Sequence, residues 1–499
     1  MPAFVISVDI GSTWTKGALI DLENPRSMER QAVATTVDDL TRGFNQVNDA
    51  LKKKAHTLDP GSDAPELFLS SSAKGGLRVV AVGIVPELTL QAATLAAASA
   101  GAKIVGSFAY KLKGGDLERM AALQPDIVLL AGGTEGGDES YILHNARALA
   151  RSTLDAAVVY AGNSAVREDA LAILSEGNKR CIGAENILPE LDRLAPESAR
   201  VAIADLFIEL IVEGRGLSVI AAQCSVRPRP TPAAVFDLVA LLETQPSGGN
   251  PNNPDFTGGL LLIDLGGATT DVYSACEPFV GESGTVFHGI PEPRVKRTVE
   301  GDLGMRVSAA NVFELAQKGK SDPSGLRNLE AWVARLADAP EMVAANSGEL
   351  ALDRELATIC TAESIRRHSG TMKPNWGVNG ISWVQKGKDL RKVRTVIASG
   401  GMFAAPGAGD VIKGALTRLE PNGYKRRTGG GAGNMVGSAS GGMDFFGTGE
   451  IPLLPNPHTV RILRDASYMA PIAANLAVSH PKVAKELMLA ALEEEKEGI

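Results

Sequence analysis

The sequence has few cysteines, few aromatic residues and no long apolar run. Its four cysteines, Cys181, Cys224, Cys276 and Cys360, lie far apart in the 499 residues. This spacing excludes a zinc or iron–sulfur motif and is typical of buried thiols in a reducing compartment. The six histidines are scattered, without a pair at metal-ligand spacing. No apolar run reaches the roughly 20 residues of a membrane-spanning helix, and no secretory signal pattern opens the chain, so we expect a cytoplasmic protein.

Composition indicates a large globular α/β protein. Apolar residues make up 44% and charged residues 22%, while aromatics are 5% and glycines number 54. The length predicts two to four domains, and the many glycines favour tight strand–helix turns. The net charge of −8 argues against nucleic acid or an anionic membrane as the main partner.

Two acidic, glycine-rich turns are the most informative feature. The first covers residues 9–16 (Asp-Ile-Gly-Ser-Thr-Trp-Thr-Lys), and the second covers residues 264–271 (Asp-Leu-Gly-Gly-Ala-Thr-Thr-Asp). Each follows a short apolar run that predicts a buried strand, and each is followed by another apolar stretch. We therefore expect two hairpins, one in each half of the chain, that close a cleft around a nucleotide.

Phosphate chemistry explains these residue types. Glycine lets backbone N–H groups approach an anion, hydroxyls add donors, and lysine adds a point charge. The carboxylates fit once a cation is present, since Mg²⁺ takes one or two carboxylates besides water and phosphate oxygens. We expect Asp9 and Asp264 to organise Mg²⁺ and the attacking water, and the phosphates to contact Gly11, Ser12, Thr13, Thr15, Lys16, Gly266, Gly267, Ala268, Thr269 and Thr270. The alternative is a pair of ordinary hairpins.

The two turns resemble the phosphate motifs of the superfamily of actin, acetate and sugar kinases and heat-shock chaperones. Residues 396–403 (Val-Ile-Ala-Ser-Gly-Gly-Met-Phe) are similar to its adenosine motif, in which a strand leads into a glycine pair and a helix. The resemblance implies an α/β fold of the actin-like (ribonuclease H-like) type with two halves. It also implies that ATP and Mg²⁺ bind, with Gly400 and Gly401 flanking the adenine.

A closer resemblance, to the MutL (GlmL) family, spans roughly residues 3–420. Five segments carry it: residues 71–78, 82–89, 130–137, 186–191 and 298–306. Members accompany glutamate mutase (methylaspartate mutase), an adenosylcobalamin enzyme; the DNA mismatch-repair protein of the same name is unrelated to them. The resemblance implies subunits of such a mutase as partners.

The pattern of elements predicts five regions. Residues 1–65 begin the first ATPase half, 66–188 form an inserted parallel α/β module, and 189–258 are the helical remainder of the first half and a linker. Residues 259–424 form the second half, and 425–499 hold a glycine-rich loop and C-terminal helices. In the module, strand ends at residues 132–134 and 162–164 indicate either a second binding surface or ordinary capped turns.

Several weaker candidates remain. Glu300, which we assign a catalytic role, and Asp302 share one face of an extended segment and can approach a γ-phosphate, with Arg306 beside a phosphate. Equally, they can be acidic residues at a helix N-terminus. We interpret residues 366–368 as a helix end, residues 425–449 as a surface loop rather than a second phosphate loop, and the acidic residues 493–495 as the solvated end of a helix.

Three functions fit these motifs. The first is an ATPase that assembles or reactivates an adenosylcobalamin-dependent mutase, which the MutL resemblance favours. The second is a small-molecule kinase of the same fold, with Asp264 or Asp302 as base. The third is an ATP-driven electron donor resembling the activators of hydroxyacyl-CoA dehydratases, which the cysteine spacing disfavours.

Overall fold

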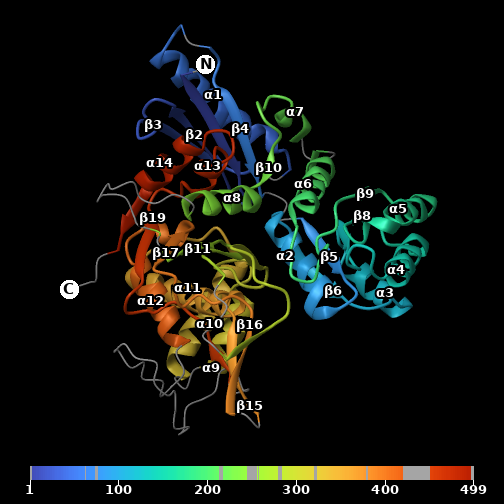
Figure 1. Cartoon of the computed structure of the whole chain (residues 1–499). Helices are drawn as coiled ribbons and strands as arrows, with labels where there is room; N and C mark the ends of the chain where they lie inside the picture. The colour runs from blue at the N-terminus through green and yellow to red at the C-terminus, as the bar shows by residue number, and fades with distance from the viewer. Residues whose placement is uncertain are drawn as a thin grey trace.

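The protein is built from α/β units, as the composition predicts (Figure 1). The computed structural model describes residues 3–36, 38–61, 63–72, 77–212, 217–243, 256, 258–278, 284–319, 323–377, 380–419 and 450–495. The segment 425–449 therefore lies outside the described residues. No helix among the described residues is long and apolar enough to cross a membrane.

The first half of the main body contains a five-stranded sheet with the order β10-β4-β1-β2-β3. Its strands are β1 (Phe4–Ile10), β2 (Trp14–Asp21), β3 (Met28–Ala34), β4 (Glu66–Ser71) and β10 (Arg229–Pro230). The hairpin of β1 and β2 is antiparallel, whereas β4 runs parallel to both β1 and β10. Helix α1 (Leu40–Leu58), capped by Asp39, packs its apolar residues on one face of this sheet.

The second half repeats this arrangement. Its sheet has the order β14-β12-β11-β17-β19-β20. The strands are β11 (Leu260–Leu265), β12 (Thr270–Ala275), β14 (Val295–Glu300), β17 (Thr395–Ser399), β19 (Arg461–Asp465) and β20 (Leu492–Glu494). Numbered within each half, the first sheet has the order 3-2-1-4-5, and the second has the same order followed by β20 as a sixth strand. In both, strand 2 is antiparallel to its neighbours and strands 1, 4 and 5 are parallel. This duplicated ribonuclease H-like topology confirms the predicted actin-like fold.

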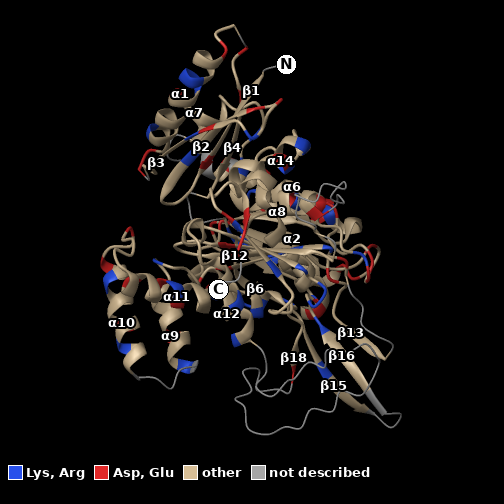
Figure 2. Ribbon diagram, turned by 90° about the vertical axis from the view of Figure 1, so that its left-hand side faces the viewer, with Lys and Arg blue, Asp and Glu red and all other residues tan. Residues whose placement is uncertain are grey.

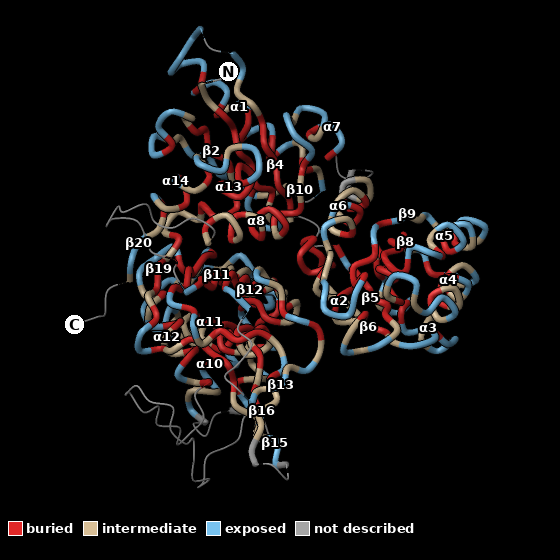
Figure 3. The backbone as a smooth tube through the Cα atoms, viewed as in Figure 1, coloured by how far each residue is buried: buried red, intermediate tan, exposed pale blue. Residues whose placement is uncertain are grey.

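Helices fill the space between and outside the two sheets. One apolar core joins alternate residues of both sheets to α8 (Thr231–Glu243), α13 (Ala470–Ala474) and α14 (Pro481–Ala491) (Figures 1 and 3). The outer face of the second sheet is covered by α9 (Ala309–Gly319), α10 (Pro323–Asp338), α11 (Ser347–His368) and α12 (Ala408–Arg418). The strands nearest the shared core are therefore buried on both faces.

The inserted module lies between β4 and β10. Its parallel sheet has the order β6-β5-β7-β8-β9 and consists of β5 (Arg78–Val82), β6 (Lys103–Phe108), β7 (Ile127–Leu130), β8 (Ala157–Tyr160) and β9 (Cys181–Gly183). The predicted start at residue 66 is wrong, because Glu66–Ser71 pairs with β1 as β4. The local sequence of an apolar strand next to a strand–helix pattern does not indicate which of two sheets the strand joins.

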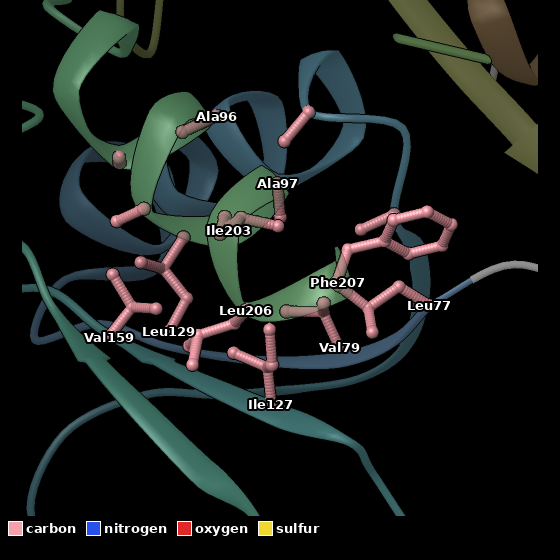
Figure 4. Close-up of a cluster of buried hydrophobic side chains, with 14 of the residues drawn as sticks. Leu77, Val79, Ala96, Ala97, Ile127, Leu129, Val159, Ile203, Leu206 and Phe207 are labelled. Carbon is pink, nitrogen blue, oxygen red and sulfur yellow. The ribbon is translucent and has the colours of Figure 1, made fainter. Parts of the chain in front are cut away.

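Helices cover both faces of the module's sheet. One face packs on α3 (Gly114–Ala122), α4 (Ser140–Arg151) and α5 (Arg167–Glu176). The other packs on α2 (Gln91–Ser99) and α6 (Glu197–Val212), and Figure 4 shows Ile203, Leu206 and Phe207 among side chains of the sheet. Because α6 follows the last strand and returns over the sheet, the segment after residue 188 completes the module's core. The short α7 (Leu217–Ala221) contacts α1.

The strand ends of the module are closed by their own loops. A Cβ atom at Gly162 would lie 2.2 Å from the Ile142 side chain and 2.6 Å from the Gly132 carbonyl oxygen. The Asn163 amide accepts from the N–H groups of Gly136 and Ala165 and donates to the Gly137 carbonyl oxygen. These bonds favour capped turns over a second binding surface at residues 132–134 and 162–164.

From sequence we predicted that the C-terminal acidic residues continue a helix, and this prediction is wrong. After α14 the chain forms β20, which pairs antiparallel with β19. Glu494 is ion-paired with Arg461, and Glu493 and Glu495 are ion-paired with Arg464. Cross-strand charge pairing, invisible in a local sequence window, therefore sets the conformation of this segment.

A fourth sheet is separate from the sheets of the two halves and of the module. It has the order β13-β16-β15-β18, from β13 (Thr285–His288), β15 (Thr371–Gly377), β16 (Gly380–Lys386) and β18 (Ile451–Pro452). Figure 2 shows the hairpin of β15 and β16 projecting away from the body. This sheet was not foreseen from sequence.

The closed strand ends predict a sharp difference between two glycines of the module. Gly162→Ala should lower stability by roughly 1–3 kcal/mol, because the new methyl group has no space beside Ile142. The matched control is Gly114→Ala, where a Cβ atom meets nothing within 4 Å at the start of α3, and which should be neutral or slightly stabilising. Thermal unfolding of both variants measures the difference; equal midpoints would contradict the packing described.

Candidate functional site

The two acidic turns occupy equivalent positions in the duplicated fold. Asp9 is paired in register with Lys16, and Asp264 with Asp271, so each hairpin carries its acidic residue just before the loop. In both loops the first glycine closes the turn: Gly11 N–H donates to the Trp14 carbonyl and Gly266 N–H to that of Thr269. A Cβ atom at either glycine would lie 2.9 Å from that same carbonyl oxygen. The two hairpins are therefore alike in backbone as well as in sequence.

The carboxylate of Asp9 is buried and held by hydroxyl groups. Ser70 Oγ and Thr231 Oγ1 both donate to its Oδ1, at 3.0 and 2.6 Å. Burial raises the pKa of Asp9 above its usual value, and the two hydrogen bonds oppose that rise. Ser70 is the last residue but one of β4, and Thr231 begins α8 directly after β10, so neighbouring parallel strands deliver both donors to one edge of the sheet.

Asp264 lies in a different environment. No described residue donates a hydrogen bond to its carboxylate, and Asp271 stands directly opposite on β12. Burial, and then the charges of Asp271 and Asp9, raise the pKa of Asp264 to about 7. A carboxyl group with this pKa is suited to exchanging a proton with water near neutral pH.

Lys16 links the two acidic residues. Burial lowers the pKa of its ammonium group, and the charges of Asp9, Asp264 and Asp465 oppose this effect. Its Nζ also lies 3.5 Å from the centre of the Tyr468 ring. Residues of both halves therefore surround Lys16, and the two hairpins converge on it.

Thr15 and Thr270 do not point toward this cluster, although both were predicted to hold phosphate. Side chains alternate along a strand, so each lies on the sheet face opposite its neighbouring acidic residue. Thr15 Oγ1 is bonded to Thr35 Oγ1, and Thr270 Oγ1 donates to the Leu303 carbonyl. These two hydroxyl groups brace the loops from behind, whereas Ser12, Thr13 and Gly267 are exposed at the loop surface.

A second segment supports the loop that follows β11. The N–H groups of Met305 and Arg306 donate to the carbonyls of Gly266 and Gly267, and Ser308 Oγ donates to that of Ala268. A Cβ atom at Gly304 would lie 2.4 Å from the Ala268 backbone, so only glycine allows this approach. The side chain of Arg306 is bound by both oxygens of Asp353. Its predicted phosphate contact is therefore replaced by a buried ion pair.

Glu300 and Asp302 are likewise engaged elsewhere. Glu300 is paired in register with Thr270, on the face opposite Asp264, and its Oε2 accepts from Arg367. Arg367 also donates to both oxygens of Asp302. This ion-pair network argues against the predicted catalytic role of Glu300. It also gives the C-terminal arginine of α11, interpreted from sequence as a plain helix end, a definite structural role.

The predicted adenosine motif has the expected form. Strand β17 runs parallel to β11, with Ser399 beside Asp264, and leads through Gly400 into the short 3₁₀ turn Gly401–Ala404. Gly400 has a φ of 116°, and a Cβ atom there would lie 2.3 Å from the Leu265 carbonyl oxygen. Gly401 is exposed, with nothing within 4 Å of its Cβ position. The glycine pair therefore borders the same sheet edge as Asp264.

Sequence reasoning missed residues that hold the cluster together. Thr231 was interpreted only as a helix cap, and Ser70 and Asp465 were not singled out. Asp465 is buried, accepts from Ser399 Oγ, and accepts from the N–H groups of Met469 and Ala470 at the start of α13. The available signal was position, since each residue lies at or just after the carboxyl end of a strand of a parallel pair.

The residues fit a magnesium ion bound together with phosphate rather than alone. Among the described residues, no group of three or more histidine, cysteine, aspartate or glutamate side chains could hold a metal. Two carboxylates from opposite halves, next to exposed hydroxyls and loop N–H groups, match the sparse protein ligation of Mg²⁺.

Comparison with solved structures gives only remote likenesses. Gluconate kinase from Lactobacillus acidophilus is matched with a TM-score of 0.34 at 10% identity, over 99% of this chain and 93% of that one. The activator of 2-hydroxyisocaproyl-CoA dehydratase from Clostridium difficile, solved with ADPNP, gives 0.27 at 10%, over 97% and 96%. A glycerol dehydratase reactivase gives 0.29 at 11%, over 83% and 95%.

Comparison by sequence is decisive. The model of the family described as MutL protein matches residues 5–492. "Protein MutL" of Clostridium tetanomorphum is 34% identical over 418 residues, which cover 83% of this chain and 89% of that protein. The family-model match takes in the two acidic hairpins, the inserted module and the glycine pair after β17. The chain belongs to the MutL protein family.

Proposed function

We propose that this protein binds Mg-ATP between its two hairpins and hydrolyses it to act on a partner enzyme. The observation that carries the proposal is the placement of Asp9 and Asp264 at equivalent points of a duplicated fold, both within the electrostatic reach of Lys16. Paired acidic hairpins with exposed loop donors suit a triphosphate and a cation, and no such pairing is needed for stability alone.

The two carboxylates take different parts in this proposal. Asp9, fixed through Oδ1 by Ser70 and Thr231, keeps a constant position and offers its second oxygen to metal-bound water. Asp264 accepts no hydrogen bond from the described residues and has a pKa of about 7, so it orients the attacking water and accepts its proton. Mg²⁺ neutralises phosphate charge when bound.

Other residues of this chain would hold the nucleotide. Lys16 balances charge at the centre of the cluster, and loop N–H groups of residues 12–13 and 267–269 contact phosphate oxygens, while those of Gly11 and Gly266 close the turns. Gly400 packs closely on Leu265 at the end of β17, and Gly401, with open space at its Cβ position, leaves room for the adenosine. Thr15 and Thr270 support the loops without touching the phosphates.

The partner we propose is an adenosylcobalamin-dependent mutase of the glutamate mutase type. Membership of the MutL family, together with the resemblance of segments outside the ATP motifs, supports this partner. Such enzymes stall when the adenosyl group is lost and the corrin stays bound. Different affinities for ATP and ADP in two arrangements of the halves would supply the work that loosens the stalled enzyme.

Removing either carboxylate should stop turnover without unfolding the chain. We expect Asp9→Asn and Asp264→Asn to lower ATP hydrolysis at least about 100-fold, since each loses a group acting on water or metal. Asp49→Asn, at an exposed position of α1, is the matched control and should retain full activity. Phosphate release by folded protein measures the effect; wild-type rates in either of the first two variants would refute the assignment.

The pKa of Asp264 also predicts how stability depends on pH. Because the folded state holds this proton up to a pH of about 7 and the unfolded chain releases it near 3.8, ionising Asp264 destabilises the fold as pH rises between these values. Asp264→Asn should therefore raise the unfolding temperature at pH 8, by about 2 °C or more, with a smaller gain at pH 5. A gain that grows toward low pH would contradict the burial of this carboxyl group.

The partner is tested with an adenosylcobalamin-dependent glutamate mutase carrying inactivated cofactor. We expect it to stimulate ATP hydrolysis about fivefold or more, since a partner that binds the two nucleotide states unequally must alter their exchange. The same mutase with intact cofactor is the control. ATP consumption that appears only with a small hydroxyl or carboxyl acceptor would instead indicate a kinase.

A further inference from the structure

Arg297 joins the inserted module to the second hairpin. It is 2% exposed and lies on β14, the edge strand of the second sheet. Its Nε donates to Asp271 Oδ1 at 2.8 Å, and its Nη1 donates to the carbonyls of Ala98 and Ala102 at 2.7 and 3.0 Å. One buried guanidinium group is thus shared between a carboxylate of the ATPase and the C-terminal end of α2.

The contact continues to the proposed catalytic residue. Asp264 and Asp271 face each other across β11 and β12, and Arg297 is paired in register with Tyr273. All of these side chains lie on one face of the sheet, because paired residues share a face and the face repeats every second residue. Movement of Arg297 would therefore change how far its positive charge compensates the negative charge of Asp271 beside Asp264.

The turn of the module that Arg297 contacts also packs on the segment that holds Asp9 of the first hairpin. Gly101, between the two carbonyls that Arg297 binds, has a φ of +87° and packs so closely that its Cβ position lies 2.9 Å from Pro230 and 3.0 Å from the Ala233 N atom. Thr231, which donates to Asp9, lies between these two residues. Residues 98–102, here called the relay turn, therefore contact segments next to both proposed catalytic carboxylates: Arg297 beside Asp271, and the residues that flank Thr231.

The interface beside the relay turn is not closely packed throughout. A cavity of about 420 Å³ lies between α2, β6 and β14, and its lining combines apolar residues such as Leu95 and Ile104 with polar residues such as Thr94 and Glu300. Near it, Lys103 Nζ donates to the Gly301 carbonyl at 3.4 Å. The module therefore has space to shift against β14, and the hydrogen bonds of Arg297 and Lys103 hold it in place.

We propose that Arg297 is a positioning residue that couples the nucleotide site to the inserted module through the relay turn. Nucleotide exchange between the hairpins moves Asp271, and Arg297 passes that movement to the carbonyls of Ala98 and Ala102. By reciprocity, a partner that displaces the module alters nucleotide affinity by the same factor. The coupling rests on the proposed nucleotide binding.

Hydrogen–deuterium exchange of the intact protein tests the coupling. Amides of residues 98–103 are followed with and without Mg-ADP, in the wild type, in Arg297→Lys, and in Arg294→Lys. Lysine keeps a charge beside Asp271 but lacks the planar guanidinium group, whose Nε bonds Asp271 while Nη1 bonds both carbonyls. Arg294, whose ion pairs go to Glu243 and Glu277, is the matched control. Nucleotide affinity and unfolding temperature are measured for each protein.

We expect Mg-ADP to change exchange in the relay turn about fivefold in the wild type and in Arg294→Lys. Arg297→Lys should bind Mg-ADP but lose this change. If Arg297→Lys does not fold, the neutral pair Arg297→Gln with Asp271→Asn replaces it, with the same expected loss. A wild type that binds nucleotide without altered exchange, or an Arg297 variant that keeps the change, overturns the coupling alone. A wild type that binds no nucleotide overturns the proposed function and the coupling together.

Discussion

The structure depends on bringing two acidic side chains, Asp9 and Asp264, close to one lysine inside the protein. Burying carboxylates costs free energy, which shows in the raised pKa of both groups. Lys16 offsets part of this cost, and Ser70 and Thr231 offset part of it at Asp9. Because of this unequal compensation, the charged form of Asp264 is less stabilised than that of Asp9. A raised pKa of this kind suits the proton exchange that we propose for Asp264.

The duplicated fold explains how distant segments meet. Each half carries an acidic residue one position before the end of its first strand and turns on a glycine, and α8 and α13 pack together between the sheets. Hydrogen bonds from Ser7 to the Ile472 carbonyl and from Asn475 to the Val8 carbonyl tie the C-terminal segment to β1. The first hairpin is thereby connected to the second half close to the site, and the inserted module contacts both halves from behind.

Sequence alone predicted the hairpins, the glycine pair and the parallel module, because these depend on local patterns of apolar residues and glycine. It failed where a side chain's role depends on a distant partner. The direction of Thr15 and Thr270 follows from strand register, the engagement of Glu300 from Arg367, and the β20 strand from Arg461 and Arg464. The contacts of Thr231 and Ser70 with Asp9 required the order of parallel strands, which no short window contains.

The central claim is that both hairpins hold one nucleotide together with one cation. Isothermal titration calorimetry of the intact protein with ATP, with and without Mg²⁺, tests it most directly. The account predicts one site per chain whose affinity rises when Mg²⁺ is present, since two carboxylates repel a bare triphosphate. Absence of binding, or binding that Mg²⁺ leaves unchanged, would contradict it.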